Sequence, residues 1–270
     1  MPRSKALSIF ALAIYIFMYV PIFVLIVFSF DNSRLAVEWH GFTLQWYEKL
    51  FHNEAVASAL ANSLIVAFTS VAVSVFMGVL AAVGLSRAKF KGTSLVRGLI
   101  VLPIIVPEIA MAVGALILFI AIGLPLGLAS VIVAHIVFCL SYVALTVMAR
   151  LEGLNPQLNE AALDLGATPV EAFFKVTLPI LLPGIISGAL LAFVLSLDDF
   201  VITQFTAGVG ATTLPLRIYS MVKFGVSPEI NALSTLMLTV TIMITLLAEW
   251  VRTHRTHPET IAQLDPASST

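Results

Sequence analysis

The segment that decides the fold reads EAALDLG at residues 160–166 and is followed at residues 176–179 by VTLP. It is a polar stretch between long apolar segments of the chain. A short segment of this kind is typical of a surface helix and not of a membrane span, which needs about 20 consecutive apolar residues. The sequence therefore places a structured, solvent-facing segment between two membrane-buried regions.

The residues around this segment carry helix start and stop signals. Asn155 is a good N-cap, Pro156 suits the first helical position, and Gly166 lies where a helix of about three turns would end. Thr168 and Glu171 then have capping-box spacing, so a second short helix starts almost at once. These signals predict two short helices that meet at Gly166.

The composition places the whole chain in a membrane. Hydrophobic residues make up 60% of the sequence, charged residues only 11%, and the mean hydropathy is +1.05. Too little polar surface is left to cover a soluble globule of this length, so a polytopic membrane protein is expected. Cys139 is the single cysteine, which excludes a disulfide within the chain and gives no sign of a cysteine metal site.

Six apolar runs are long enough to cross a bilayer, and they define an all-α membrane protein. They lie at residues 7–30, 60–85, 98–121, 126–149, 182–206 and 231–251. The first run is too long for a cleaved signal peptide and is interpreted as an uncleaved helix. With both termini cytoplasmic, ten of the 14 Lys and Arg residues fall in inside segments, as the positive-inside rule requires.

This topology predicts the organisation of the chain. Residues 1–30 hold the first transmembrane helix with a short cytoplasmic N-terminus, and residues 31–59 form an outside loop. Residues 60–252 form the membrane core and include a cytoplasmic loop at 150–181. Residues 253–270 are expected to be a disordered cytoplasmic tail.

The segment at 160–179 carries a specific resemblance. A Glu-Ala-Ala triplet, a Gly four residues after the second Ala, nine further residues and then a β-branched residue, any residue and Leu-Pro resembles the signature loop of binding-protein-dependent ABC importer permeases. Val176 is the one departure, since isoleucine is usual there. The resemblance implies six transmembrane helices in the type I ABC importer permease fold. It also implies that the loop is a coupling helix seated in a groove of an ATPase, with these contact residues: Glu160, Ala161, Ala162, Asp164 and Gly166. Gly166 is expected to turn the chain where a Cβ would clash.

The chain itself offers no means of using ATP. It contains no Gly-x-x-x-x-Gly-Lys-Ser/Thr motif, so a P-loop is absent and the chain is not expected to be an enzyme or to hold a cofactor. The resemblance implies that ATP and Mg²⁺ bind to a homodimeric ABC ATPase. It also implies a second, related permease subunit that completes a heterodimer and a periplasmic substrate-binding protein. No nucleic acid partner is expected.

Three acidic residues inside the predicted spans need an explanation. Glu108 lies about nine residues, or roughly 13 Å of helix rise, into the third span, and Asp198 and Asp199 lie in the outer part of the fifth. No Lys or Arg falls inside any predicted span to pair with them, and an unpaired carboxylate is costly there. Pro103 and Pro107 predict a kinked helix beside a cavity just before Glu108.

Three interpretations of these acids stay open. They can bond neighbouring hydroxyls or a partner subunit, they can form a proton relay with His135, or they can line a path for a cationic solute that supplies the missing positive charge. His135 is the lone histidine in a predicted span, and such a residue is more often packed or hydrogen-bonded than a relay. Because Asp198 and Asp199 are about 100° apart on a helix, only one is expected to face the path, and Asp198 is favoured.

A narrower resemblance points to the solute. Asn62-Ser63-Leu64, Leu197-Asp198-Asp199-Phe200 and the segment 219–229 resemble the smaller membrane subunit of spermidine/putrescine importers. This implies import of a small cationic polyamine from periplasm to cytoplasm by alternating access. Tyr219 and Trp46 are then candidates for cation–π contacts, with interfacial anchoring as the alternative. Lys223 is either a repelling gate or a side chain that snorkels to the interface.

Two other function classes compete with an ATP-driven importer. A proton- or cation-coupled secondary transporter would use Glu108 and Asp198 as ion sites, but inverted repeats and glycine-broken helix pairs are not obvious. A membrane enzyme is the least favoured class. An aspartyl intramembrane protease needs two carboxylates that converge from two helices, and adjacent Asp198 and Asp199 cannot face each other on one helix.

Overall fold

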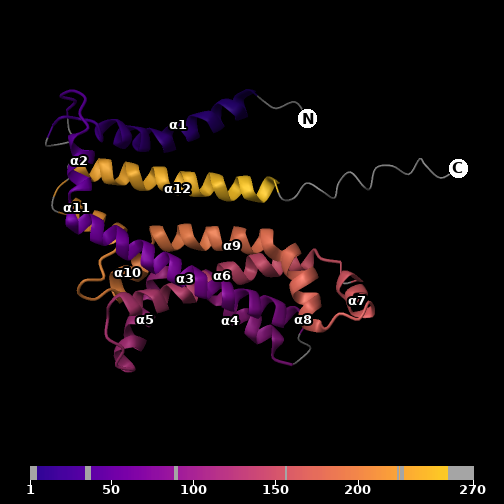
Figure 1. Ribbon diagram of the computed structural model, residues 1–270. Helices are drawn as coiled ribbons and strands as arrows, with labels where there is room; N and C mark the ends of the chain where they lie inside the picture. Colours follow the sequence, from indigo (N-terminus) through magenta and orange to yellow (C-terminus); the bar gives the residue numbers. More distant parts are fainter. Residues whose placement is uncertain are drawn as a thin grey trace. The chain divides into compact units, whose positions relative to one another are not determined.

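The computed structural model describes residues 5–33, 38–87, 91–155, 157–223, 225 and 228–254. Its described residues are almost entirely helical, with one isolated β-bridge between Asp31 and Phe42 and no β-strand. The prediction of an all-α protein is therefore confirmed. The longer elements are α1 (Lys5–Phe28), α3 (Glu54–Arg87), α4 (Thr93–Ile105), α5 (Glu108–Ala121), α6 (Leu128–Glu152), α9 (Leu178–Asp198) and α12 (Pro228–His254) (Figure 1).

Shorter helices connect these elements. Those of the predicted outside loops are α2 (Gln45–Phe51) and α11 (Leu214–Lys223), and α10 (Val201–Thr206) follows α9. The predicted coupling loop holds α7 (Gln157–Asp164), α8 (Pro169–Ala172) and the π-helical turn η1 (Phe173–Thr177), which leads into α9. The predicted disordered tail begins at 253, and its residues 255–270 lie outside the described residues.

Five helical stretches of the described chain are long and apolar enough to cross a membrane, and a sixth arises only if one bent helix pair counts as a span. That pair is α4 and α5, which are bent by 110°. The prediction of one kinked helix over 98–121 is therefore corrected to two helices. The physical reason is local: Val106 and Pro107 are both extended, with ψ near 134° and 132°, and Pro107 has no N–H to continue the helix.

The predicted span 182–206 is also interrupted. Helix α9 ends at Asp198, Asp199 is extended with φ −64° and ψ 127°, and α10 starts two residues later. Neither a proline nor a glycine lies between Ser196 and Thr203. The sequence therefore contains neither of the usual helix-breaking residue types at this break.

The first compact unit consists of residues 1–60 and 214–241. Its core joins α2 and the start of α3 to α11 and the start of α12, through the buried residues Trp46, Leu50, Val56, Ala59, Leu214, Ala232 and Leu233. The Asn53 amide donates to Glu229 Oε1 at 3.1 Å across the same elements. In contrast, none of the residues in the most hydrophobic stretch of α1 is buried.

The second compact unit consists of residues 61–213 and 242–270. Helix α6 forms its centre and packs against α9, where an added Cβ at Gly188 would lie only 3.3 Å from Val143 Cα. Small residues at such positions let membrane helices approach closely. Ser70 and Ser74 of α3 each donate to a carbonyl of α6, at 3.2 Å. Within this unit α7 and α8 lie at one end and α5 and α10 at the other (Figure 1).

Candidate functional site

The predicted coupling segment is built by local capping. Asn155 Oδ1 accepts the Gln157 N–H at 3.0 Å, as expected of a helix start, while Pro156 lies outside the described residues. Helix α7 has eight residues, about two turns and not the expected three. Glu160, Ala161, Asp164 and Gly166 are exposed and Ala162 is half-buried. Thus most of the predicted contact residues face away from the chain's own core.

Gly166 ends α7 in a Schellman motif. The Ala167 N–H donates to the Ala162 carbonyl at 3.0 Å and the Gly166 N–H to the Leu163 carbonyl at 2.9 Å, with Gly166 at φ +86°. The prediction that a Cβ would clash here is wrong within this chain, since an added Cβ meets nothing within 4 Å. The glycine is required instead by its left-handed backbone, which side chains rarely adopt.

The predicted second short helix is confirmed, together with its capping box. Thr168 Oγ1 accepts the Glu171 N–H at 3.3 Å, and Glu171 Oε2 accepts the Thr168 N–H at 3.0 Å. The Lys175 ammonium lies 3.2 Å from Glu171 Oε1 on the next turn. All three side chains are therefore engaged close to their own positions in sequence.

A cavity of about 430 Å³ separates α7 from the ends of the longer helices of the second unit. Glu160 lines it, together with Arg87, whose guanidinium is 3.3 Å from Asn159 Oδ1. Arg97 and Glu152 also line it and form an exposed ion pair at 3.9 Å. The Arg87–Asn159 contact joins α7 to the end of α3 and leaves most of α7 exposed.

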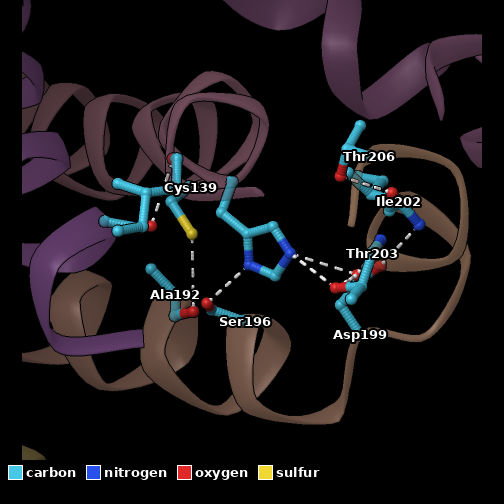
Figure 2. A network of polar contacts seen from close by, with 10 residues as sticks. Cys139, Ala192, Ser196, Asp199, Ile202, Thr203 and Thr206 are labelled. Carbon is cyan, nitrogen blue, oxygen red and sulfur yellow. Dashed lines mark hydrogen bonds and ion pairs between the residues drawn. The ribbon is translucent and has the colours of Figure 1, made fainter. Parts of the chain in front are cut away.

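Asp199 and His135 form a buried polar network between α6 and the α9–α10 break (Figure 2). Asp199 Oδ2 accepts the Thr203 hydroxyl at 2.8 Å and the Thr203 N–H at 2.9 Å, and Oδ1 accepts the Ile202 N–H at 3.2 Å. His135 Nε2 lies 3.1 Å from Asp199 Oδ2, and Nδ1 lies 2.8 Å from Ser196 Oγ. Asp199 thus bonds hydroxyl and imidazole groups of its own chain, as one of the three interpretations expected.

Glu108 is the first residue of α5 and is exposed in this chain. Its predicted depth of roughly 13 Å assumed a continuous helix from residue 98, and the bend between α4 and α5 removes that helix. The Glu108 carboxyl group lies close enough to Asp199 for the two acids to interact electrostatically. The structure therefore brings together two acids that lie 91 residues apart (199 − 108) in sequence.

Asp198 and Asp199 differ sharply although they are adjacent. Asp198 is the last residue of α9 and is exposed, whereas Asp199 has 6% of its surface exposed.

The loop after α10 is bonded to Asn62 of α3. The Asn62 side-chain amide donates to the carbonyls of Gly210 and Thr212, at 3.0 Å each. Asn62, the first residue of the Asn62-Ser63-Leu64 segment, therefore stabilises this loop.

The other predicted path residues belong to the first unit. Trp46 is buried, its Nε1 donates to the Asp31 carbonyl at 2.7 Å, and the Lys49 ammonium lies 4.4 Å from its ring centroid. Tyr219 and Lys223 are exposed on α11. The structure thus gives Trp46 a cation from its own chain.

The partners of His135 were not predicted from the sequence. Ser196, Asp199 and Thr203 recur at intervals of three and four residues, which places them on one side of a helical segment. This spacing, together with a lone histidine in an apolar run, was the available signal. The long separation from residue 135 gave no indication of which helix would face them.

Comparisons with known proteins bear on these sites. The family model described as "Binding-protein-dependent transport system inner membrane component" matches residues 74–254. The chain is 39% identical over 257 residues to the spermidine/putrescine transport system permease protein PotC of Haemophilus influenzae, covering 95% of this chain and 100% of that protein. It is 42% identical over 243 residues to the putrescine transport system permease protein PotI of Escherichia coli strain K12, covering 87% and 86%.

The fold is also similar to a solved structure. A bacterial ABC transporter involved in the import of the acidic polysaccharide alginate matches with a TM-score of 0.74, covering 92% of this chain and 94% of that chain at 18% identity. A likeness at this identity concerns the fold alone. The predicted importer permease fold is confirmed by this match together with the family match.

Proposed function

The chain belongs to the family of binding-protein-dependent transport system inner membrane components, and we propose that it is the permease subunit of an ATP-driven importer of spermidine or putrescine. The observation that carries this proposal is the likeness to two polyamine permeases over most of the chain. The fold does not choose the solute, because a transporter of an acidic polysaccharide shares it. The cationic solute therefore rests on the relatives and on the acids of this chain.

Glu108 and Asp198 are the acids that we assign to the substrate path. Both are exposed in this chain, and each marks a helix end at a break. The C-terminus of α9, where Asp198 lies, adds the negative end of the helix dipole to a carboxylate, and both attract a cation. Asp199 is assigned a supporting role next to this site, because its oxygens already accept hydrogen bonds from Thr203, Ile202 and His135.

Aromatic and basic residues of α11 supply the outer contacts in this proposal. Tyr219 has 51% of its surface exposed and can offer its ring face to an ammonium group. Lys223, one turn further along α11, would repel a cation until the path opens. Trp46 is left out of these contacts, because its ring is buried and already faces Lys49.

Coupling to ATP hydrolysis takes place through α7 and α8. They expose apolar side chains that a partner surface would cover: Leu163 at 39%, Leu165 at 89% and Val170 at 65%. In this proposal one subunit of a homodimeric ABC ATPase binds them, and ATP and Mg²⁺ stay on that partner. A second, related permease completes a heterodimer, and a periplasmic binding protein delivers the solute. Closure of the ATPase moves α7, and the attached helices open the path alternately to either side.

The proposed location is the bacterial inner membrane with both termini in the cytoplasm. Support comes from the charge distribution, since ten of the 14 Lys and Arg residues then face the cytoplasm. This orientation also puts α7 on the side where ATP is available. The comparisons give no support to the alternative of a proton- or cation-coupled secondary transporter.

The test is uptake of labelled spermidine and putrescine by cells that lack their own polyamine importers and express the complete complex. We expect ATP-dependent uptake that falls at least about tenfold in Asp198→Asn and Glu108→Gln, because each loses a charge that pairs with the solute. Glu48→Gln, an exposed acid of α2, is the matched control and should keep normal uptake. Absence of uptake of both amines in the wild type, with protein present in the membrane, would remove the polyamine assignment.

A further inference from the structure

The break between α9 and α10 contains no proline or glycine. Asp199 is held extended between two helices, and the residues from Ser196 to Thr203 include neither of the usual helix-breaking types. Sharp interruptions of a helix need an identifiable cause, such as proline, glycine or a side chain that competes for the backbone. With proline and glycine absent, a side chain that competes for the backbone is the remaining cause.

Asp199 competes for the backbone at this point. Its two oxygens accept the N–H groups of Ile202 and Thr203, which are first-turn donors of α10 that have no helical partner. The same side chain is buried, so a carboxylate at this position needs a further donor. His135 Nε2, from α6, lies 3.1 Å from Asp199 Oδ2 and 3.1 Å from Thr203 Oγ1.

The partners of His135 fix which nitrogen carries the proton. Thr203 gives its one hydroxyl hydrogen to Asp199, so neither atom that faces Nε2 has a hydrogen left to donate when Asp199 is ionised. Nε2 must then be the N–H donor, and Nδ1 is left to pair with the Ser196 hydroxyl at 2.8 Å. His135 is fully buried, so it spans the break in one orientation, from the last turn of α9 to the first turn of α10.

Helix α6 bonds to both sides of the break around this histidine. Ser130 Oγ donates to the Thr206 carbonyl of α10 at 2.8 Å. Cys139 Sγ donates to the Ala192 carbonyl of α9 at 3.6 Å (Figure 2). These outer contacts reach backbone atoms on α9 and α10 only. His135 is the contact that reaches Asp199 itself.

We propose that His135 is a positioning residue of the transport path, which fixes the break at Asp199 and thereby the direction of the adjacent Asp198. This inference rests on the proposed function, which assigns Asp198 to the path. With Asp199 bound to His135, the chain turns after α9 and leaves Asp198 exposed. Without that bond, α9 can continue through Asp199, and both carboxylates change direction.

The test is a double-mutant cycle between His135 and Asp198, measured as KM and Vmax of polyamine uptake in the complete complex. We expect His135→Leu to lower Vmax/KM about tenfold, the effect of losing one buried hydrogen bond to a charged group. His135→Gln, whose amide can still donate to Asp199, should recover most of the uptake. Ser130→Ala is the matched control: it removes a buried α6–α10 hydrogen bond but leaves Asp199 untouched, so it should keep a KM close to the wild-type value.

The double variant decides between positioning and a general structural role. If His135 acts through Asp198, adding His135→Leu to Asp198→Asn lowers uptake no further. Independent, multiplicative losses would overturn the proposal, as would equal effects of His135→Leu and Ser130→Ala on KM.

A second measurement separates this inference from the proposed function. In a Cys139→Ala background with cysteine-free partner subunits, Asp198→Cys is the one cysteine of the complex, and its reaction rate with a cationic thiol reagent reports its direction. We expect His135→Leu to change that rate and His135→Gln to preserve it. An unchanged rate in His135→Leu overturns the positioning role, whereas a changed rate with normal uptake in Asp198→Asn overturns only the path assignment.

Discussion

The α7–α8 segment and the α9–α10 break are both places where a helix stops, but they are held by opposite means. In α7–α8 the stop signals are exposed and local: the glycine at 166 and the capping box of Thr168 and Glu171 lie within a few residues of the backbone groups they satisfy. At the α9–α10 break the decisive donor is buried and comes from His135, 64 residues away (199 − 135).

This difference separates a movable part from a fixed one. The caps of α7 and α8 lie within the segment itself, so the segment can shift with a partner without losing them. The buried network ties three helical elements together, and any change of its geometry must repack α6 against α9 and α10. Substitutions in each region therefore test this difference.

The largest effect on stability is expected from Asp199→Ala. This change leaves His135 Nε2, the Thr203 hydroxyl and the first-turn amides of α10 without their shared acceptor. We expect the free energy of unfolding in detergent to fall by about 3 kcal/mol. Chemical denaturation followed by circular dichroism measures it. Asp199→Asn, which keeps one acceptor oxygen, should fall between this variant and the wild type, and equal stability of all three would show that the network does not hold the break.

Gly166→Val should disrupt the α7–α8 segment at a smaller cost in stability than Asp199→Ala. A β-branched side chain at φ +86° costs about 1–2 kcal/mol in the backbone of α7's end. We expect membrane insertion to stay normal and the amount of polyamine transported per ATP hydrolysed to fall. Both are measured in proteoliposomes with the complete complex. Gly166→Asn, which tolerates this conformation, is the control; normal uptake in Gly166→Val would contradict the docking role.

Thr168→Ala tests the smallest of the three effects. It removes the acceptor for the Glu171 N–H and should destabilise the start of α8 by about 1 kcal/mol. Hydrogen–deuterium exchange should become faster in α8 and η1 and stay unchanged around His135. Lys175→Ala removes only the exposed pair with Glu171 and should leave the exchange rates close to those of the wild type, because exposed ion pairs contribute little. Faster exchange in the buried network after Thr168→Ala would show that the two regions are not independent.

The sequence predicted what depends on neighbours in the chain. Asn155, Gly166, Thr168 and Glu171 were read as start and stop signals, and each has that role in the structure. The resemblance to importer permeases was carried by the same segment and is confirmed by the family match. Only the reason for Gly166 was wrong, because a backbone angle and not a steric contact requires the glycine.

The two interrupted spans show where this reasoning failed. The apolar runs at 98–121 and 182–206 were read as single helices, since hydropathy does not register a change of direction within an apolar run. Pro107 signalled the first interruption but not its angle of 110°. At Asp199 an aspartate can cap a following helix, but its buried partner His135 lies on α6 and could not be placed from the local sequence.

The sequence by itself determined the membrane environment, the apolar spans and the capped segment at 155–171, because hydropathy and capping act over a few residues. The tertiary structure alone decided that Asp199 is buried against His135 while Asp198 is exposed. Two adjacent aspartates have the same intrinsic chemistry. The buried histidine that the fold brings to Asp199 makes their environments different.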